Sequence, residues 1–175
     1  MRKWLSLLLI TLLAGILRFG HLGSMPPSPN WDEVSHGYNA YSILQTGQDE
    51  WGRSFPTIFK AFGDFKLPLY IYLTILPVAA FGLIVFSIRF ISALAGVLAI
   101  PGIYLLFSAL FPGKHISLKN KKIELGIIAA LFLTIMPWHF FLSRPALEAN
   151  LALTLIIFAT YFLIKAKYIP SALLF

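Results

Sequence analysis

Cysteine is absent from all 175 residues of this chain, and residues that carry a charge are few. Without cysteine the chain can form neither disulfides nor thiolate metal sites, so its loops must be held by other contacts. Only 12% of the residues are charged, whereas 58% are apolar and the mean hydropathy is +0.80. This composition departs from that of soluble globular domains and predicts a membrane protein.

Several charge-free apolar runs approach the length of about 20 residues that a helix needs to cross a bilayer core. The sequence therefore predicts an all-α fold, a polytopic transmembrane helical bundle. The expected spans are residues 4–19, 90–111, 123–142 and 147–164. A last run begins at Tyr168 and reaches Phe175 in half a span, so residues 1–175 are expected to be the N-terminal part of a longer, truncated transmembrane domain.

The first apolar run resembles a signal peptide, because Arg2 and Lys3 precede it. No small-x-small cleavage site follows it, so we expect an uncleaved anchor.

The formal net charge of +7 arises from short basic clusters beside the apolar runs, a pattern typical of orientation signals. Membrane lipid is therefore the expected polyanion, and no nucleic-acid partner is expected. If every apolar run crossed, lysines 114–122 would lie opposite Arg2 and Lys3, which violates the positive-inside rule. One run should therefore lie at the interface.

Residues 67–86 are the run that we expect at the interface, because Pro68 and Pro77 interrupt it. A second interfacial helix is expected at residues 31–46, where apolar residues follow a helical period. Together these helices would form one long external loop, with the acidic residues mostly on the external side.

Asp32 and Glu33 stand out because they are adjacent carboxylates in that loop, shortly after the first expected span. Carboxylates are also favoured in the first turn of a helix, so capping alone would explain one of them. His36 follows Asp32 at i+4, a spacing that allows both to ligate a divalent metal, although two such residues are a weak signal. Trp31 is typical of an interfacial anchor.

Three basic residues, Lys66, Arg89 and Arg144, are expected at membrane depth on the same side as the acids. Guanidinium and ammonium groups there would suit a phosphate, while Asp32 could deprotonate an acceptor hydroxyl. Simpler roles remain open. Lys66 and Arg89 could extend to lipid headgroups, and Arg144 could pair with Glu148 at i+4.

Five short motifs follow one another in an order that carries more information than any of them alone. They are Leu17-Arg18-Phe19, Trp31-Asp32-Glu33, Gly63-Asp64-Phe65-Lys66-Leu67-Pro68, Arg89-Phe90-Ile91-Ser92-Ala93-Leu94-Ala95-Gly96 and Ser143-Arg144-Pro145-Ala146-Leu147-Glu148. In this order they resemble the GT-C type of lipid-phosphate-sugar-dependent glycosyltransferases, which include protein O-mannosyltransferases and aminoarabinose transferases. The resemblance covers nearly the whole chain.

The resemblance implies transfer of a sugar from a polyprenyl or dolichyl phosphate carrier to a lipid, glycan or protein acceptor, with inversion at the anomeric carbon. Asp32 matches the family's catalytic aspartate, a general base that Glu33 would support. Lys66, Arg89 and Arg144 match positions that hold the donor phosphate. The protein would then be a multi-pass protein of the plasma membrane with an extracytoplasmic site.

Two departures from the family pattern leave further roles open. Phe65 stands where some relatives have an acid before the lysine, and Glu148 stands at a slightly different spacing from an aspartate of some relatives. A divalent metal and a supporting role for Glu148 or His36 therefore stay undecided.

Two other functions remain as alternatives: a protein that binds or transports a phosphorylated lipid without catalysis, and a structural assembly subunit. An ionised side chain at mid-bilayer costs about 2.5 to 3.5 kcal/mol. We therefore expect Asp32, Lys66, Arg89 and Arg144 to line one hydrated cavity.

Overall fold

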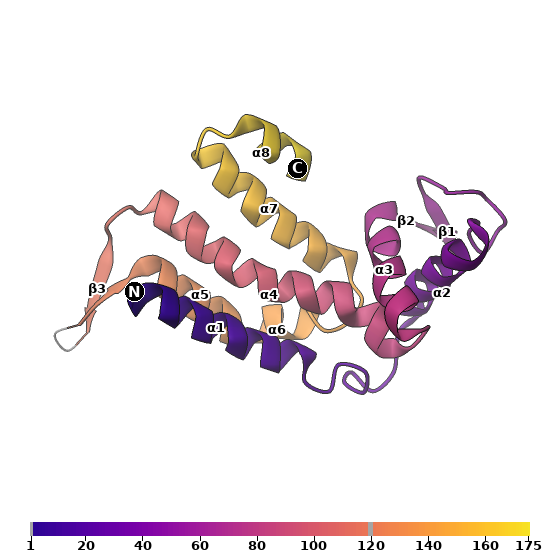
Figure 1. Ribbon diagram of the computed structural model, residues 1–175, viewed down its shortest axis with the longest axis horizontal. Helices are drawn as coiled ribbons and strands as arrows, with labels where there is room; N and C mark the ends of the chain where they lie inside the picture. Colours follow the sequence, from indigo (N-terminus) through magenta and orange to yellow (C-terminus); the bar gives the residue numbers. More distant parts are fainter. Residues whose placement is uncertain (1, 119–120) are drawn as a thin grey trace.

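The computed structural model describes residues 2–118 and 121–175, and helices dominate it (Figure 1). In chain order the elements are α1 (Arg2–Phe19), α2 (Trp31–Thr46), β1 (Phe59–Ala61), β2 (Asp64–Lys66), α3 (Pro68–Phe81), α4 (Val85–Leu110), β3 (His115–Leu118), β4 (Lys121–Glu124), α5 (Leu125–Ile135), α6 (Pro137–Leu142), α7 (Glu148–Ile164) and α8 (Tyr168–Leu174).

The long helix α4 is the centre of the molecule, with α1, α5 and α7 packed along it (Figure 1). Helix α1 runs antiparallel to α4, because Trp4 lies against Tyr104 and Phe19 lies against Phe90, with ring centroids 5.9 and 5.3 Å apart. Buried apolar side chains of α1, α4 and α5, among them Ile100, fill the space between these helices.

Helix α7 runs parallel to α4, and polar side chains tie the two together. The side-chain amide of Asn150 donates to the carbonyl of Ser92 at 2.7 Å, and the hydroxyl of Thr154 donates to the carbonyl of Ala95 at 3.0 Å. All four residues are buried, so these bonds satisfy groups that would otherwise be costly to bury.

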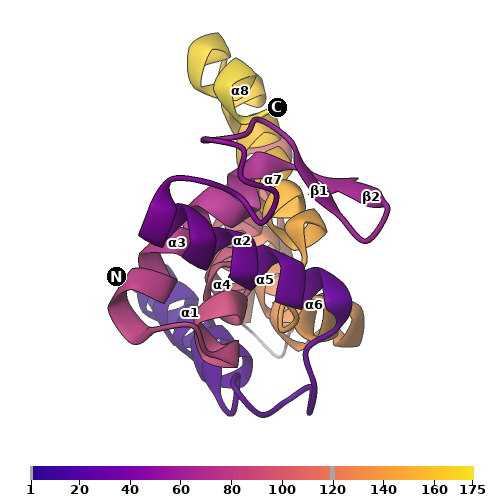
Figure 2. The ribbon, with the colours of Figure 1, turned by 90° about the vertical axis from the view of Figure 1, so that its right-hand side faces the viewer.

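Helices α2 and α3 and the β1–β2 hairpin form a second cluster at the N-terminal end of α4, on the right in Figure 1. Viewed from that end, α2 crosses in front of the helices that surround α4 (Figure 2). The cluster has its own core, in which Ala40 and Ile43 of α2 meet Phe59 of β1 and Ile71 and Val78 of α3.

The prediction of a polytopic transmembrane bundle is wrong. Within residues 2–118 and 121–175, only α4 is long and apolar enough to cross a membrane by length and composition. Helices α3, α5 and α7 are apolar but have only 14, 11 and 17 residues. The two antiparallel hairpins, β1–β2 and β3–β4, also depart from an all-α fold. The helical character itself agrees with the prediction.

The expected span at residues 123–142 is interrupted at both ends of α5. Strand β4 includes the first two residues of this range, and Pro137 separates α5 from α6. Proline has no N–H to donate to the carbonyl of Leu133. The buried guanidinium of Arg18 donates a hydrogen bond to that carbonyl instead, at 3.4 Å. It also donates to His139 Nδ1 at 2.7 Å.

Helix α2 begins at Trp31 and ends at Thr46, the residues expected from the sequence, while the run at residues 67–86 divides between two helices. Helix α3 ends at Phe81, because Gly82 adopts a positive φ of 80° that other residues rarely tolerate. Helix α4 then begins at Val85. Whether α2 and α3 lie at a membrane surface stays a prediction.

Candidate functional site

The first turn of α2 is fixed by a capping box. Asn30 accepts a hydrogen bond from the backbone N–H of Glu33 at 2.9 Å, and the Glu33 carboxylate accepts one from the backbone N–H of Asn30 at 3.0 Å. This reciprocal pair satisfies donors that a helix N-terminus leaves free. It also fixes the helical turn that contains Trp31 and Asp32.

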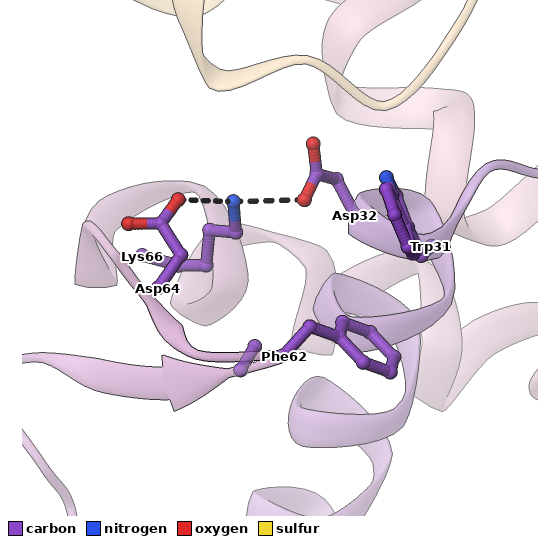
Figure 3. Close-up of a pocket in the computed structure, with 6 residues that line it drawn as sticks. Trp31, Asp32, Phe62, Asp64 and Lys66 are labelled. Carbon is purple, nitrogen blue, oxygen red and sulfur yellow. Dashed lines mark hydrogen bonds and ion pairs between the residues drawn. The ribbon is translucent and has the colours of Figure 1, made fainter.

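Asp32 forms an ion pair with Lys66, which the β1–β2 hairpin brings to it. Lys66 Nζ lies 2.8 Å from Asp32 Oδ1 and 3.1 Å from Asp64 Oδ2 (Figure 3). The bond to Asp32 is the main reason that the pKa of Lys66 is raised, while partial burial opposes it. The backbone N–H of Phe65, followed by Lys66, lowers the pKa of Asp64. Lys66 and Asp64 are therefore charged at neutral pH.

An open pocket of about 230 Å³ surrounds this ion pair. It is lined by Trp31, Asp32, Ala61, Phe62, Asp64 and Lys66. The rings of Trp31 and Phe62 lie 6.1 Å apart and are both largely exposed. Figure 3 shows the second carboxylate oxygen of Asp32 pointing away from Lys66, where it can accept a proton or a hydrogen bond.

Glu33 does not share this exposure, because it is 1% exposed and bonded to a buried guanidinium. Arg89 Nε lies 2.7 Å from Glu33 Oε1, and Arg89 Nη2 donates to Glu33 Oε2 at 3.2 Å. Glu33 Oε1 also accepts from the backbone N–H of Ala146 at 2.9 Å. The two adjacent carboxylates thus have different surroundings: Glu33 joins α2 to α4, and Asp32 faces the pocket.

Arg89 uses all five of its N–H groups. Besides the two bonds to Glu33, it donates to the backbone carbonyls of Leu22, Pro26 and Ser28, at 3.1, 2.8 and 3.2 Å. The side chain is fully buried. In this arrangement no N–H of Arg89 is left for a donor phosphate.

The N–H groups of Arg144 are also all hydrogen-bonded, and every acceptor is a backbone carbonyl. It donates to Leu17, Arg18 and Gly20 at 2.7 to 3.3 Å, and twice to Met25 at 3.2 and 3.0 Å. These carbonyls belong to the end of α1 and the turns after it. Arg144 is therefore a cap for α1. It does not form the ion pair with Glu148 that the sequence offered as an alternative.

The expectation that four charged residues line one cavity is met only in part. Asp32 and Lys66 lie together in the pocket, whereas Arg89 and Arg144 are buried and are not among its lining residues. The reason is that backbone carbonyls of residues 17–28 surround both guanidinium groups.

Glu148 lies close enough to the pocket for the charged groups there to influence its pKa. Burial raises its pKa most, the backbone N–H of Leu67 and the charge of Lys66 act in the opposite direction, and the charges of Asp32 and Asp64 add to the rise. Its Oε2 is buried and has no hydrogen-bond partner among the residues that the structure describes. Glu148 is therefore a carboxyl group that can hold a proton beside the pocket.

His36 is buried behind Asp32, against the ring of Tyr70 at 5.0 Å. Its Nδ1 lies 3.1 Å from the carbonyl of Ala146, so Nδ1 carries the proton. Burial is the main cause that lowers the pKa of His36, and the ring is neutral at neutral pH. His36 thus connects α2 to the segment before α7.

A metal site is not apparent in the described part of the chain. No group of three or more histidine, aspartate or glutamate side chains there is arranged to hold a metal ion. The metal role that the sequence left open for Asp32 and His36 therefore has no support from this geometry.

Sequence reasoning assigned no role to Asp64, although its carboxylate contacts Lys66. The signal was present, because residues two apart in a strand point to the same face. It also missed the pairing of Trp31 with Phe62. That contact joins α2 to the turn between β1 and β2, and no local pattern indicates it.

Comparisons with protein-family models, curated proteins and solved structures found no match for this chain.

Proposed function

We propose that this protein is a membrane-associated glycosyltransferase that moves a sugar from a polyprenyl or dolichyl phosphate carrier to an extracytoplasmic acceptor, with inversion. Asp32 is the general base that removes the proton of the acceptor hydroxyl. The observation that carries the proposal is the Asp32–Lys66 ion pair in an open pocket, with the second oxygen of Asp32 free of the lysine.

The division between the two carboxylates supports this role for Asp32. A general base must be reachable by its substrate and held in place by its neighbours. The side chain of Asp32 is 37% exposed, and α2 is anchored on both sides by the bonds of Glu33 to Arg89 and Ala146. Glu33 is thus a positioning residue for Asp32.

Lys66 supports the reaction through its charge. Its ammonium group is paired with Asp32, and its remaining N–H can contact an anionic leaving group as negative charge develops there. Arg89 and Arg144 support the reaction indirectly, since their bonds to residues 17–28 hold the chain that leads into α2. The donor-phosphate role is therefore proposed for Lys66 alone.

Exposed apolar surface supports membrane association. Helix α1 exposes Leu5, Leu8, Leu9, Leu12 and Ile16, each by more than half. Continuous apolar surface of this kind is rare on soluble monomers and is typical of contact with lipid or protein. Helix α2 also exposes apolar side chains, namely Val34, Tyr38, Tyr41 and Leu44.

The decisive variant is Asp32→Asn, which keeps the shape of the side chain and removes the base. Membranes that contain the protein are incubated with labelled polyprenyl-phosphate sugars, and transfer to endogenous acceptors is measured. We expect transfer to fall by at least about 100-fold, the smaller end of the range for general acid–base catalysis.

The matched control is Asp64→Asn, because Asp64 contacts the same lysine and the substitution makes the same change in charge. It should retain most of the transfer. Equal losses in both variants would show that charge at Lys66 matters rather than a base at position 32. Unchanged transfer in Asp32→Asn would eliminate the assignment of Asp32 as the base. No transfer by the wild-type protein, with phosphorylated lipid still bound, would favour lipid binding without catalysis.

A further inference from the structure

Exposed lysines collect at the C-terminal end of α4, opposite the pocket. The chain brings them together from three places, because α1 begins there, the β3–β4 hairpin follows α4 there, and α7 ends there (Figure 1). We call this group the lysine pole, and it consists of Lys3, Lys114, Lys122, Lys165 and Lys167.

Contacts between elements fix this placement. Trp4 of α1 packs on Tyr104 of α4 at 5.9 Å, and Lys3 Nζ lies 5.6 Å from the centre of the Trp4 ring. The hydroxyl of Tyr104 also donates to Glu124 at the end of β4. On the other side, Gly102 of α4 adjoins Ile157 of α7, so the parallel helices end near each other.

The β3–β4 hairpin has two different faces. Its register pairs Ser117 with Lys122 and Ile116 with Ile123. Because neighbouring residues in a strand point to opposite faces, the lysine lies on one face and both isoleucines lie on the other. Ile116 is 43% exposed. Such a hairpin can place apolar side chains in lipid and a lysine among headgroups.

No lysine of the lysine pole forms an ion pair with an acid in the described part of the chain. Glu124 is the acid at this end, and the hydroxyls of Ser108 and Tyr104 hold its carboxylate at 3.0 and 3.4 Å. The ion pairs of the described residues all lie at the pocket end, at Asp32, Asp64 and Glu33. An external polyanion would therefore meet unpaired ammonium groups.

We infer that the lysine pole binds the headgroups of anionic phospholipids, in the leaflet opposite the pocket. Helix α4 has 26 residues, a length of about 39 Å at 1.5 Å per residue, which is close to the thickness of a bilayer with its headgroup regions. Lys114 follows four residues after its end. This inference rests on the membrane association in the proposed function and is independent of glycosyl transfer.

The test uses the whole chain, purified in a neutral detergent and given equal amounts of phosphatidylglycerol and phosphatidylcholine. Native mass spectrometry measures the ratio of the two lipids retained. The wild-type protein should retain phosphatidylglycerol preferentially. In the double variant Lys114→Gln with Lys122→Gln, the ratio of phosphatidylglycerol to phosphatidylcholine retained should fall about twenty-fold. The reason is that each lysine near an anionic surface contributes roughly five-fold in affinity.

The control variant, Arg53→Gln with Lys60→Gln, removes two exposed positive charges at the pocket end and should keep the preference. Equal retention of the two lipids by the wild-type protein, or equal effects of the two double variants, would overturn the inference. Displacement of phosphatidylglycerol by an equimolar duplex oligonucleotide would also overturn it in favour of nucleic acid. Retention of neither lipid would instead contradict the membrane association itself.

Discussion

At the scale of single residues, the contrast between Asp32 and Glu33 depends on Arg89. The Glu33–Arg89 pair is almost fully buried, so each charge needs the other. Replacing Glu33 by Gln leaves a buried guanidinium without a counter-charge. We expect this change to lower the free energy of unfolding by about 3 to 5 kcal/mol, measured by thermal unfolding in detergent.

A second variant separates the buried charge from other effects of the Glu33→Gln substitution. Combining Glu33→Gln with Arg89→Met removes both charges, so the double variant should be more stable than Glu33→Gln alone. Asp64→Asn, which changes an exposed partner of Lys66, should leave unfolding nearly unchanged. A double variant no more stable than Glu33→Gln would contradict a penalty from unpaired charge.

Glu148 provides a prediction about pH at the same scale. Its pKa is raised in the folded protein from an ordinary value of 4.5, so the folded state favours the protonated carboxyl. This contribution to stability is complete below pH 4.5 and is lost as the pH rises through the folded pKa. The unfolding temperature of Glu148→Gln, measured relative to that of the wild-type protein, should therefore increase as the pH rises from 4 to 8. A difference that stays constant with pH would contradict the raised pKa.

At the scale of elements, Arg144 determines how α1 ends. Five N–H groups of one side chain satisfy carbonyls at the end of α1 and as far as Met25, which a lysine with three donors cannot reproduce. In Arg144→Lys we expect amide hydrogen exchange in residues 20–28 to accelerate by at least about tenfold, since bonds to charged donors contribute about 1.5 to 3 kcal/mol each.

The matched control for this element is Arg53→Lys, a substitution at an exposed loop position. It should leave exchange in residues 20–28 unchanged. If Arg144→Lys exchanged at the wild-type rate there, the turns after α1 would be held by Arg89 or by packing, and Arg144 would not be their cap.

At the scale of the whole molecule, the acidic residues of the ion pairs and the lysine pole lie at opposite ends of α4. The pocket end contains Asp32, Asp64 and Glu148, and the other end contains the lysine pole. If α4 crosses a membrane, the two ends lie on opposite sides of it. The absence of native cysteine makes this directly testable.

We expect a membrane-impermeant maleimide to label Lys60→Cys in intact cells, and to label Lys122→Cys only after the membrane is permeabilised. Both positions are exposed, so a difference reports the side of the membrane rather than burial. Equal labelling of both variants in intact cells would contradict a crossing by α4.

Local features of the sequence determined the helical character of this protein and the helix at Trp31–Thr46, because caps and helical periodicity act over a few neighbouring residues. They did not determine the two hairpins. They also did not determine the break at Pro137, because the long apolar run there resembled an uninterrupted span.

Only the tertiary structure decided which carboxylate faces the pocket and what the arginines bind. Glu33 and Arg89 are 56 residues apart, and Arg144 lies 119 residues from Met25. A side chain at an apolar helix end has the same local sequence whether it meets a phosphate, a headgroup or a backbone carbonyl. Its partner is set by which distant segments pack around it, and burial then decides how strongly that partner is needed.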